Sequence, residues 1–223
     1  MNVTGQIGKF AAKRQRDAIA QRMKEGMNFG NSSKVDWEDY NYPPLLQIIH
    51  FSLDDIEDAQ AKSAVRWAHM SYRFVCFTLL FNIAATLVLV SSGAKGSFLN
   101  VLYSIFNFII VSLVGLYSFY NAYKGLATNN MSMSLKYIMI QCLTIVFMVV
   151  SVSAYGANFN GLGSLKKANN ASSKIKQMWV AWVIVESIMW IINLCTGIYS
   201  ALKVQQNRRE GRPTAFPLTE NPT

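Results

Sequence analysis

Four apolar stretches, none of which contains proline, most constrain what this chain can fold into. They cover residues 74–92, 98–120, 135–155 and 178–200. A helix of about 20 residues crosses the ~30 Å hydrocarbon core of a bilayer, and none of the stretches shows the alternating pattern of a barrel strand. We therefore expect an all-α integral membrane protein with four antiparallel transmembrane helices, none of them kinked by proline.

Charge is distributed unevenly along the chain. Charged residues make up 15% of the sequence, against about 25% in typical soluble domains. Residues 1–73 hold ten Lys or Arg and nine Asp or Glu, whereas residues 74–200 hold seven Lys and one acid. This predicts a polar head over 1–73, a membrane bundle over 74–200 and a polar tail over 201–223.

The basic residues flank the apolar stretches, as they do at the cytosolic ends of membrane helices. They do not form one dense run with interleaved aromatic residues, so the net charge of +9 does not indicate a nucleic-acid partner. With both termini and the second loop inside, nine Lys or Arg near the membrane lie inside and five outside. The count predicts that the head and the tail are cytosolic.

The three connections differ in length and composition. Residues 93–97 form a tight turn, so the first two helices should be antiparallel neighbours. Residues 121–134 are expected to form a second loop of moderate length, on the cytosolic side. Residues 156–177, rich in Gly, Asn and Ser, are expected to form the longest loop, on the other side.

The head is expected to contain three parts. Residues 4–25 read as a basic helix, which fits either a contact with anionic lipid or a solvated or coiled-coil face; its basic residues include Lys9, Lys13, Arg14 and Arg16. Pro43 and Pro44 predict an extended, polyproline-like segment. Ser52 is predicted to cap a helix that continues into the first span.

Short motifs follow one another in order from residue 41 to about residue 209. They are Asn41-Tyr42-Pro43-Pro44, Ile49-His50, Asp54-Asp55-Ile56, Phe81-Asn82, Tyr120-Asn121-Ala122-Tyr123-Lys124 and Glu186-Ser187. In this order and spacing the chain resembles the secretory carrier-associated membrane protein (SCAMP) family. The resemblance implies a four-helix protein of Golgi, endosomal or plasma membranes that acts in vesicle trafficking, membrane recycling or fusion.

The chain departs from the family pattern in two places. Gly115-Leu116-Tyr117-Ser118 stands where the family usually carries Trp-Tyr-Arg-Pro, the segment to which lipid binding and fusion are attributed. The Asn-Pro-Phe repeats of many members are also missing, since Asn221-Pro222 is followed by Thr223. The chain therefore resembles a divergent, short-headed member.

Glu186 is the one acidic residue within the four apolar stretches. A charge at mid-bilayer costs roughly 2.5–3.5 kcal/mol on insertion scales, so we expect Glu186 to face the bundle interior. Asn193, seven residues on, is expected on the same face; Asn82 and Asn107 offer polar partners from other helices, and Asn82 is the expected partner. A proton or ion relay is the alternative, but the spans contain no second acid and no His, which favours a protonated, hydrogen-bonded packing residue.

Tyr120, Tyr123 and Lys124 are expected at the membrane interface, where aromatic and basic residues gather and could contact lipid. No catalytic motif, metal-ligand cluster or haem-binding His pair is present, so we expect neither an enzyme nor a cofactor. A small channel or transporter, or an accessory subunit of a larger complex, remains the alternative function. The lipid bilayer is the expected partner, an oligomer is compatible with the pattern, and protein partners are not specified.

Overall fold

The computed structural model of the chain describes residues 35–94, 97–153 and 159–210. The expected basic helix, including Lys9, Lys13, Arg14 and Arg16, and the tail from residue 211 lie outside the described residues. The chain divides into two units, residues 1–51 and residues 52–223. We describe each unit by itself.

Four long helices dominate the second unit: α2 (Ala59–Ser91), α3 (Leu99–Ala127), α4 (Met131–Ser153) and α6 (Ser173–Glu210). All four are long and apolar enough to cross a membrane, which confirms the predicted all-α membrane fold class. At 1.5 Å per residue α2 is about 50 Å long and α6 about 57 Å, so their ends extend beyond a ~30 Å hydrocarbon core.

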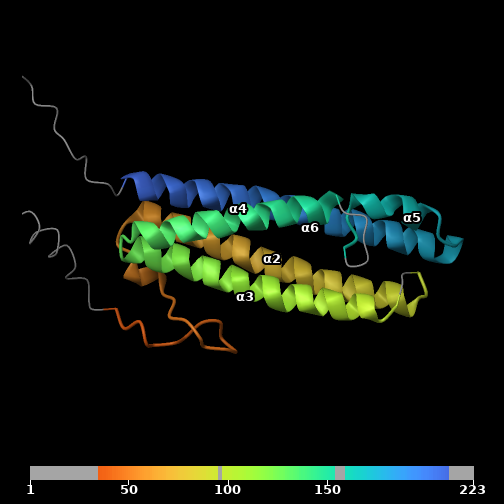
Figure 1. Cartoon of the computed structure of the whole chain (residues 1–223), viewed down its shortest axis with the longest axis horizontal. Coiled ribbons are helices and arrows are strands. Elements are labelled where there is room, and N and C mark those ends of the chain that lie inside the picture. The colour runs from red at the N-terminus through yellow and green to blue at the C-terminus, as the bar shows by residue number, and fades with distance from the viewer. Residues whose placement is uncertain (1–34, 95–96, 154–158, 211–223) are drawn as a thin grey trace, which may run out of the picture. The chain divides into compact units, whose positions relative to one another are not determined.

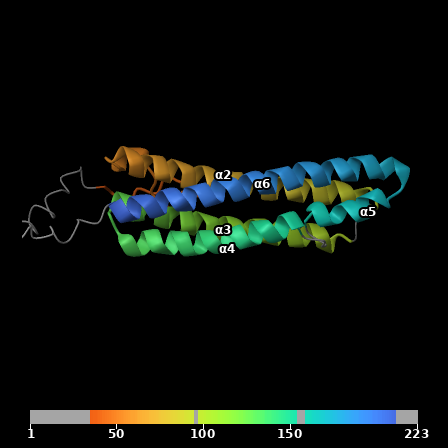
Figure 2. The same ribbon diagram turned by 90° about the horizontal axis from the view of Figure 1, so that it is seen from above.

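The four helices form a bundle in which each packs against two neighbours (Figure 1). α2 and α6, which are far apart in the sequence, pack against each other, and α6 also packs against α4. The colours in Figures 1 and 2 show that each long helix runs back along the one before it. We call the end where α2 and α4 begin the entry end, and the opposite end, where α3 and α6 begin, the far end.

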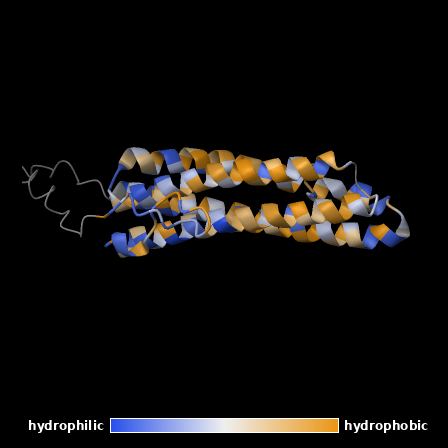
Figure 3. Ribbon diagram, turned by 90° about the horizontal axis from the view of Figure 1, so that it is seen from below, coloured by the Kyte–Doolittle hydropathy of each residue, from blue (hydrophilic) through white to orange (hydrophobic). Residues whose placement is uncertain are grey.

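The residues along the middle of the bundle are mostly hydrophobic (Figure 3), and many of the large apolar ones are exposed on its outside. Each of the four long helices exposes large apolar residues, as Phe77, Ile110, Leu143 and Ile188 illustrate. Such an exposed apolar surface needs a nonaqueous surrounding. Polar residues gather toward both ends, so the hydropathy pattern fits a bilayer around the middle of the bundle.

The bundle interior combines a few large apolar residues with many small and polar ones. Val75, Leu79, Met148 and Trp190 form one buried cluster, and Leu89 and Trp179 belong to a second one nearer the far end. Lipid tails are as apolar as these side chains, so burying them gives little hydrophobic gain. Close packing and interhelical hydrogen bonds must stabilise the bundle instead.

The second loop is much shorter than predicted. α3 continues to Ala127 and α4 begins at Met131, so only residues 128–130 connect them rather than residues 121–134. Asn130 caps α4, since its side-chain Oδ1 accepts hydrogen bonds from the backbone of Ser132 and Met133 at 3.1 and 3.2 Å. The prediction of a 14-residue loop was wrong because it ended each helix where the apolar stretch ends, whereas the helices continue into the polar residues between the stretches.

The segment before α2 also differs from the prediction. Ser52 caps only a single 3₁₀ turn, η1 (Leu53–Asp55), and α2 has its own cap at Asp58. The Asp58 carboxylate accepts from the backbone N–H groups of Gln60 and Ala61 at 3.3 and 2.8 Å. Because each has its own cap, η1 and α2 are two separate helices rather than one continuous helix.

The third connection contains two short helices, η2 (Leu162–Ser164) and α5 (Leu165–Asn169), followed by the start of α6. Ala168 of α5 is buried against the far-end cluster of α2 and α6. Part of this connection is therefore packed onto the bundle rather than forming a free surface loop.

The described part of the first unit is a turn rather than the predicted extended segment. Tyr42 and Ile49 pair in an antiparallel bridge, and the Pro43 carbonyl accepts from the backbone N–H groups of Leu46 and Gln47 at 3.0 and 2.8 Å. Asn41 closes the turn by accepting a 2.9 Å bond from the Phe51 backbone. The two prolines reverse the chain here because they sit at the start of this hydrogen-bonded turn.

Candidate functional site

Glu186 lies in a fully buried cluster of hydrogen-bond donors between α2, α6 and the third connection. Its side chain is 0% exposed. Oε1 accepts from Asn82 Nδ2 at 2.8 Å, from the Asn160 backbone N–H at 3.1 Å and from Trp190 Nε1 at 3.4 Å. Oε2 accepts from Asn160 Nδ2 at 3.0 Å. These donors replace the water that a carboxyl group loses on burial.

Asn160 reaches Glu186 because the third connection folds back into the bundle. Phe159 packs edge-on against Phe147 and Trp190, with ring centroids 5.5 and 6.0 Å apart, and this anchors the residue before Asn160. On the other side, a Cβ on Gly161 would lie 2.3 Å from the Ser151 carbonyl oxygen. Only glycine permits this approach to the end of α4.

Further polar pairs join the helices on both sides of Glu186. Asn193 Nδ2 donates to Thr78 Oγ1 at 2.6 Å, and Ser104 Oγ donates to Thr86 Oγ1 at 3.4 Å. Thr78, Asn82 and Thr86 recur every four residues, so α2 presents them along one face. With Gln141–Ser71 and Tyr137–Ser200 toward the entry end, they form a series of interhelical contacts that we call the polar ladder.

The structure brings together some of the expected intramembrane residues and separates one. Asn82 and Glu186 form the expected pair, and Asn193 lies on the ladder. Asn107 on α3 is half-buried and is not among the donors to Glu186. Sequence reasoning missed Asn160, because an Asn in a Gly- and Asn-rich connection carries no signal that it is buried.

A second cluster lies at the entry end and involves Tyr123. The Tyr123 hydroxyl donates to the Asp55 carboxylate and accepts from the Ser52 backbone N–H at 3.2 Å. We call this set the clasp, because it holds η1 against the last turns of α3. Tyr123 is 0% exposed, so the expected lipid contact of this residue does not fit its burial.

The neighbouring residues of the same motif lie closer to the surface. Lys124 Nζ donates to the Tyr120 hydroxyl at 3.0 Å and lies 5.4 Å from the centre of the Tyr120 ring. Tyr117, one turn earlier, is half-exposed. This face of α3 combines aromatic rings with one cation, which suits the interface between a bilayer and water.

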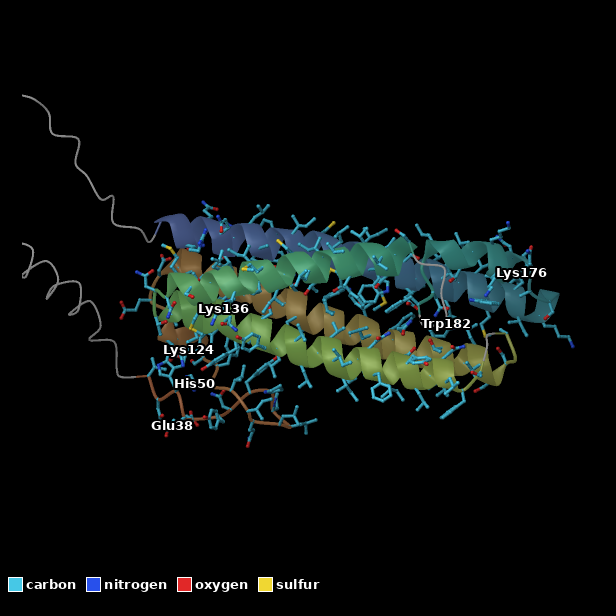
Figure 4. The ribbon with its side chains drawn as sticks, viewed as in Figure 1. Glu38, His50, Lys124, Lys136, Lys176 and Trp182 are labelled. Carbon is cyan, nitrogen blue, oxygen red and sulfur yellow. The ribbon has the colours of Figure 1, made fainter. Side chains whose placement is uncertain are left out.

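Positive charge is present at both ends of the bundle. Figure 4 places Lys124 and Lys136 at the entry end and Lys176 at the far end. Trp182, also labelled there, packs against Phe81 of α2 with ring centroids 4.9 Å apart. Among the described residues no group of three or more His, Cys, Asp or Glu side chains could hold a metal ion.

Comparison with known protein families gives a match over most of the chain. The model of the SCAMP family matches residues 39–211. This range includes the turn at Asn41-Tyr42-Pro43-Pro44, all four long helices, the clasp and Glu186. No curated protein and no solved structure matches the chain significantly.

Proposed function

The chain belongs to the SCAMP family, and from that membership we propose that it is a vesicle-carrier protein of post-Golgi and endosomal membranes that takes part in membrane recycling or fusion. The family is one of membrane trafficking proteins. The observation that carries the proposal is the family match over residues 39–211, which includes four helices of membrane-spanning length.

The proposed orientation places the entry end in the cytosol. Both termini and residues 128–130 would then be cytosolic, and the connection that contains Asn160 would be luminal. The distribution of Lys and Arg along the chain supports this orientation, nine against five. The clasp and the exposed residues of α3 would then face the compartment in which trafficking proteins assemble.

We assign the lipid contact at the entry end to the surface of α3 rather than to the clasp. Tyr120 and Lys124 supply an amphipathic surface, together with the half-exposed Tyr117. Tyr123 instead holds η1 in place through its bonds to Asp55 and Ser52. Lys9, Lys13, Arg14 and Arg16 remain proposed contacts for anionic lipid on the head.

We propose that Glu186 is structural rather than part of an ion pathway. Its oxygens accept bonds from Asn82, Asn160 and Trp190. Trp190, one of these donors, also belongs to the buried apolar cluster with Leu79 and Met148. These contacts suit a fixed packing centre that joins α2, α6 and the third connection.

Location and cargo traffic in cells test the proposed role. The chain, tagged at its C-terminus, should colocalise with markers of recycling endosomes and the trans-Golgi, and its depletion should slow the return of an internalised receptor to the surface. A chain confined to another membrane, or normal receptor return after complete depletion, would contradict the proposal. Flux through liposomes that contain the purified protein tests the channel alternative separately.

A further inference from the structure

The entry half of α2 carries a recess that is separate from both the Glu186 cluster and the clasp. Its volume is about 510 Å³, and its lining consists of Arg66, His69, Met70, Arg73, Phe74 and Phe77. Arg66 and Arg73 are seven residues apart, which is about two helical turns, so their side chains project from the same face of α2. Both arginines are exposed.

The positive charge in this recess has no protein counter-ion among the described residues. α2 contains no Asp or Glu between Ala59 and Ser91. Near the start of α2, Asp54 pairs with Lys62 rather than with either arginine. An arginine guanidinium presents a planar set of N–H donors that matches two phosphate oxygens at once. Two of them on one face therefore favour a phosphate group.

The part of the recess that lies toward the middle of the bundle is apolar. Met70 lies between the arginines along the helix, and Phe74 and Phe77 follow toward the middle of the bundle. Phe77 is 60% exposed and marks the beginning of the outer apolar surface of α2. A ligand that fills both parts must therefore carry a phosphate at one end and a hydrocarbon chain at the other.

The wall of the recess is held in place by α3. The His69 ring stacks on Phe119 with ring centroids 4.9 Å apart, and Phe119 is buried. His69 therefore keeps its position between the two arginines. The recess is preorganised on this side, which lowers the cost of ordering it around a ligand.

We propose that this recess binds an anionic phospholipid, with the phosphate of its headgroup between Arg66 and Arg73 and an acyl chain along Met70, Phe74 and Phe77. The site is distinct from the surface formed by Tyr120 and Lys124. The proposal requires only that α2 crosses a bilayer, so it does not depend on the trafficking role.

Native mass spectrometry of the full-length protein from nanodiscs tests the site. The nanodiscs contain phosphatidylcholine with either phosphatidylserine or phosphatidylinositol phosphate. We expect a bound anionic lipid whose affinity falls about tenfold for each guanidinium removed, in Arg66→Gln and Arg73→Gln. The double variant Arg66→Lys/Arg73→Lys keeps the charge but loses the planar donor set, so it should bind with intermediate affinity.

Lys136→Gln provides the matched control, because it removes one positive charge at the same end of the bundle. It should leave the affinity unchanged. Equal losses in Lys136→Gln and Arg73→Gln would show only a general attraction of charge and would overturn the site. A photoreactive anionic lipid on the wild-type protein gives a second test, since its crosslinks should map to residues 70–77, and crosslinks confined to other helices would overturn the proposal.

The source of the phosphate is tested with soluble headgroups. Inositol bisphosphate, the soluble headgroup of phosphatidylinositol phosphate, and inorganic phosphate should compete with the lipid only weakly, because they leave the apolar half empty. Phe77→Ala should lower the affinity for the lipid without changing the affinity for inositol bisphosphate. If the soluble headgroup binds as tightly as the lipid, or Phe77→Ala affects neither ligand, the site is one for a free phosphate compound and the lipid proposal is wrong.

Discussion

Asn160 donates both its backbone N–H and its side-chain amide to Glu186, at 3.1 Å to Oε1 and 3.0 Å to Oε2. A residue from the third connection thus closes the polar cluster that Asn82 and Trp190 begin. The carboxyl group joins α2, α6 and a segment that leaves α4. A substitution that displaces the third connection should therefore also weaken the packing of α2 against α6.

The first prediction concerns the side chain of Asn160. Asn160→Ala removes the bond to Oε2 and should lower the free energy of unfolding by about 1 kcal/mol, within the range measured for interhelical hydrogen bonds in membranes. Asn160→Asp should cost more, because it places a second carboxyl group against Glu186. Unfolding in mixed detergent micelles measures both. Equal stability of the two variants would contradict the close approach.

The second prediction compares two substitutions of Glu186. Glu186→Gln keeps the Oε1 acceptor, and rotation of the Asn160 amide restores the remaining bond, so the cost should be below about 1 kcal/mol. Glu186→Leu leaves the donors of Asn82, Asn160 and Trp190 without their acceptor and should cost about 3 kcal/mol. The same micelle assay measures this difference. If the Gln variant folds normally but abolishes cargo recycling or an ion flux that the wild-type protein shows, the relay interpretation is correct.

The pair between Asn82 and Glu186 was predictable, and the reason is energetic. An acid in an apolar stretch must face the bundle interior and find a hydrogen-bonding partner there, and Asn82 is one of the few residues with a side-chain amide in the other apolar stretches. Asn160 was not predictable from the same rule. It lies in a connection where asparagine is common, and only the packing of Phe159 and the absence of a side chain at Gly161 bring it into the bundle.

The four spans were also predictable, but their helices extend further than the apolar stretches. Hydropathy detects contact with hydrocarbon, whereas a helix continues for as long as its backbone bonds are satisfied. For this reason α3 continues to Ala127, and Tyr123, which was expected at the membrane interface, is buried in its last turns. The start of α2 was misplaced for a related reason, since Ser52 and Asp58 are both good caps and the sequence does not rank them.

The third prediction concerns Gly161. A methyl group at this position would lie 2.3 Å from the Ser151 carbonyl oxygen and 2.4 Å from that of Val152. Both are backbone atoms, so the connection must move away and Asn160 with it. Gly161→Ala should therefore cost about 1–3 kcal/mol. The neighbouring Leu162→Ala is the control, since Leu162 is half-exposed and its truncation should have little effect.

The fourth prediction concerns the clasp. Tyr123→Phe removes the hydroxyl that joins Asp55 and Ser52, so hydrogen exchange at Ser52 and protease cleavage before Asp58 should both increase. A double-mutant cycle with Asp55→Asn should give a coupling energy of about 1–2 kcal/mol. Tyr120→Phe, which loses only the bond from Lys124, should leave exchange at Ser52 unchanged. An equal increase in both Phe variants would show that the clasp does not hold η1.

The last prediction concerns orientation, on which the placement of every cytosolic contact depends. In a chain whose own three cysteines are replaced, single cysteines at Gly5 and Gly211 should react with a membrane-impermeant maleimide only after vesicles with the cytosolic face inward are opened. A cysteine at Leu162 should react from outside without opening, because Leu162 is exposed in the third connection. The physical reason is the excess of Lys and Arg beside the entry end, which the insertion machinery retains in the cytosol. Reaction of Gly5 and Gly211 in intact vesicles, with Leu162 protected, would reverse the proposed orientation.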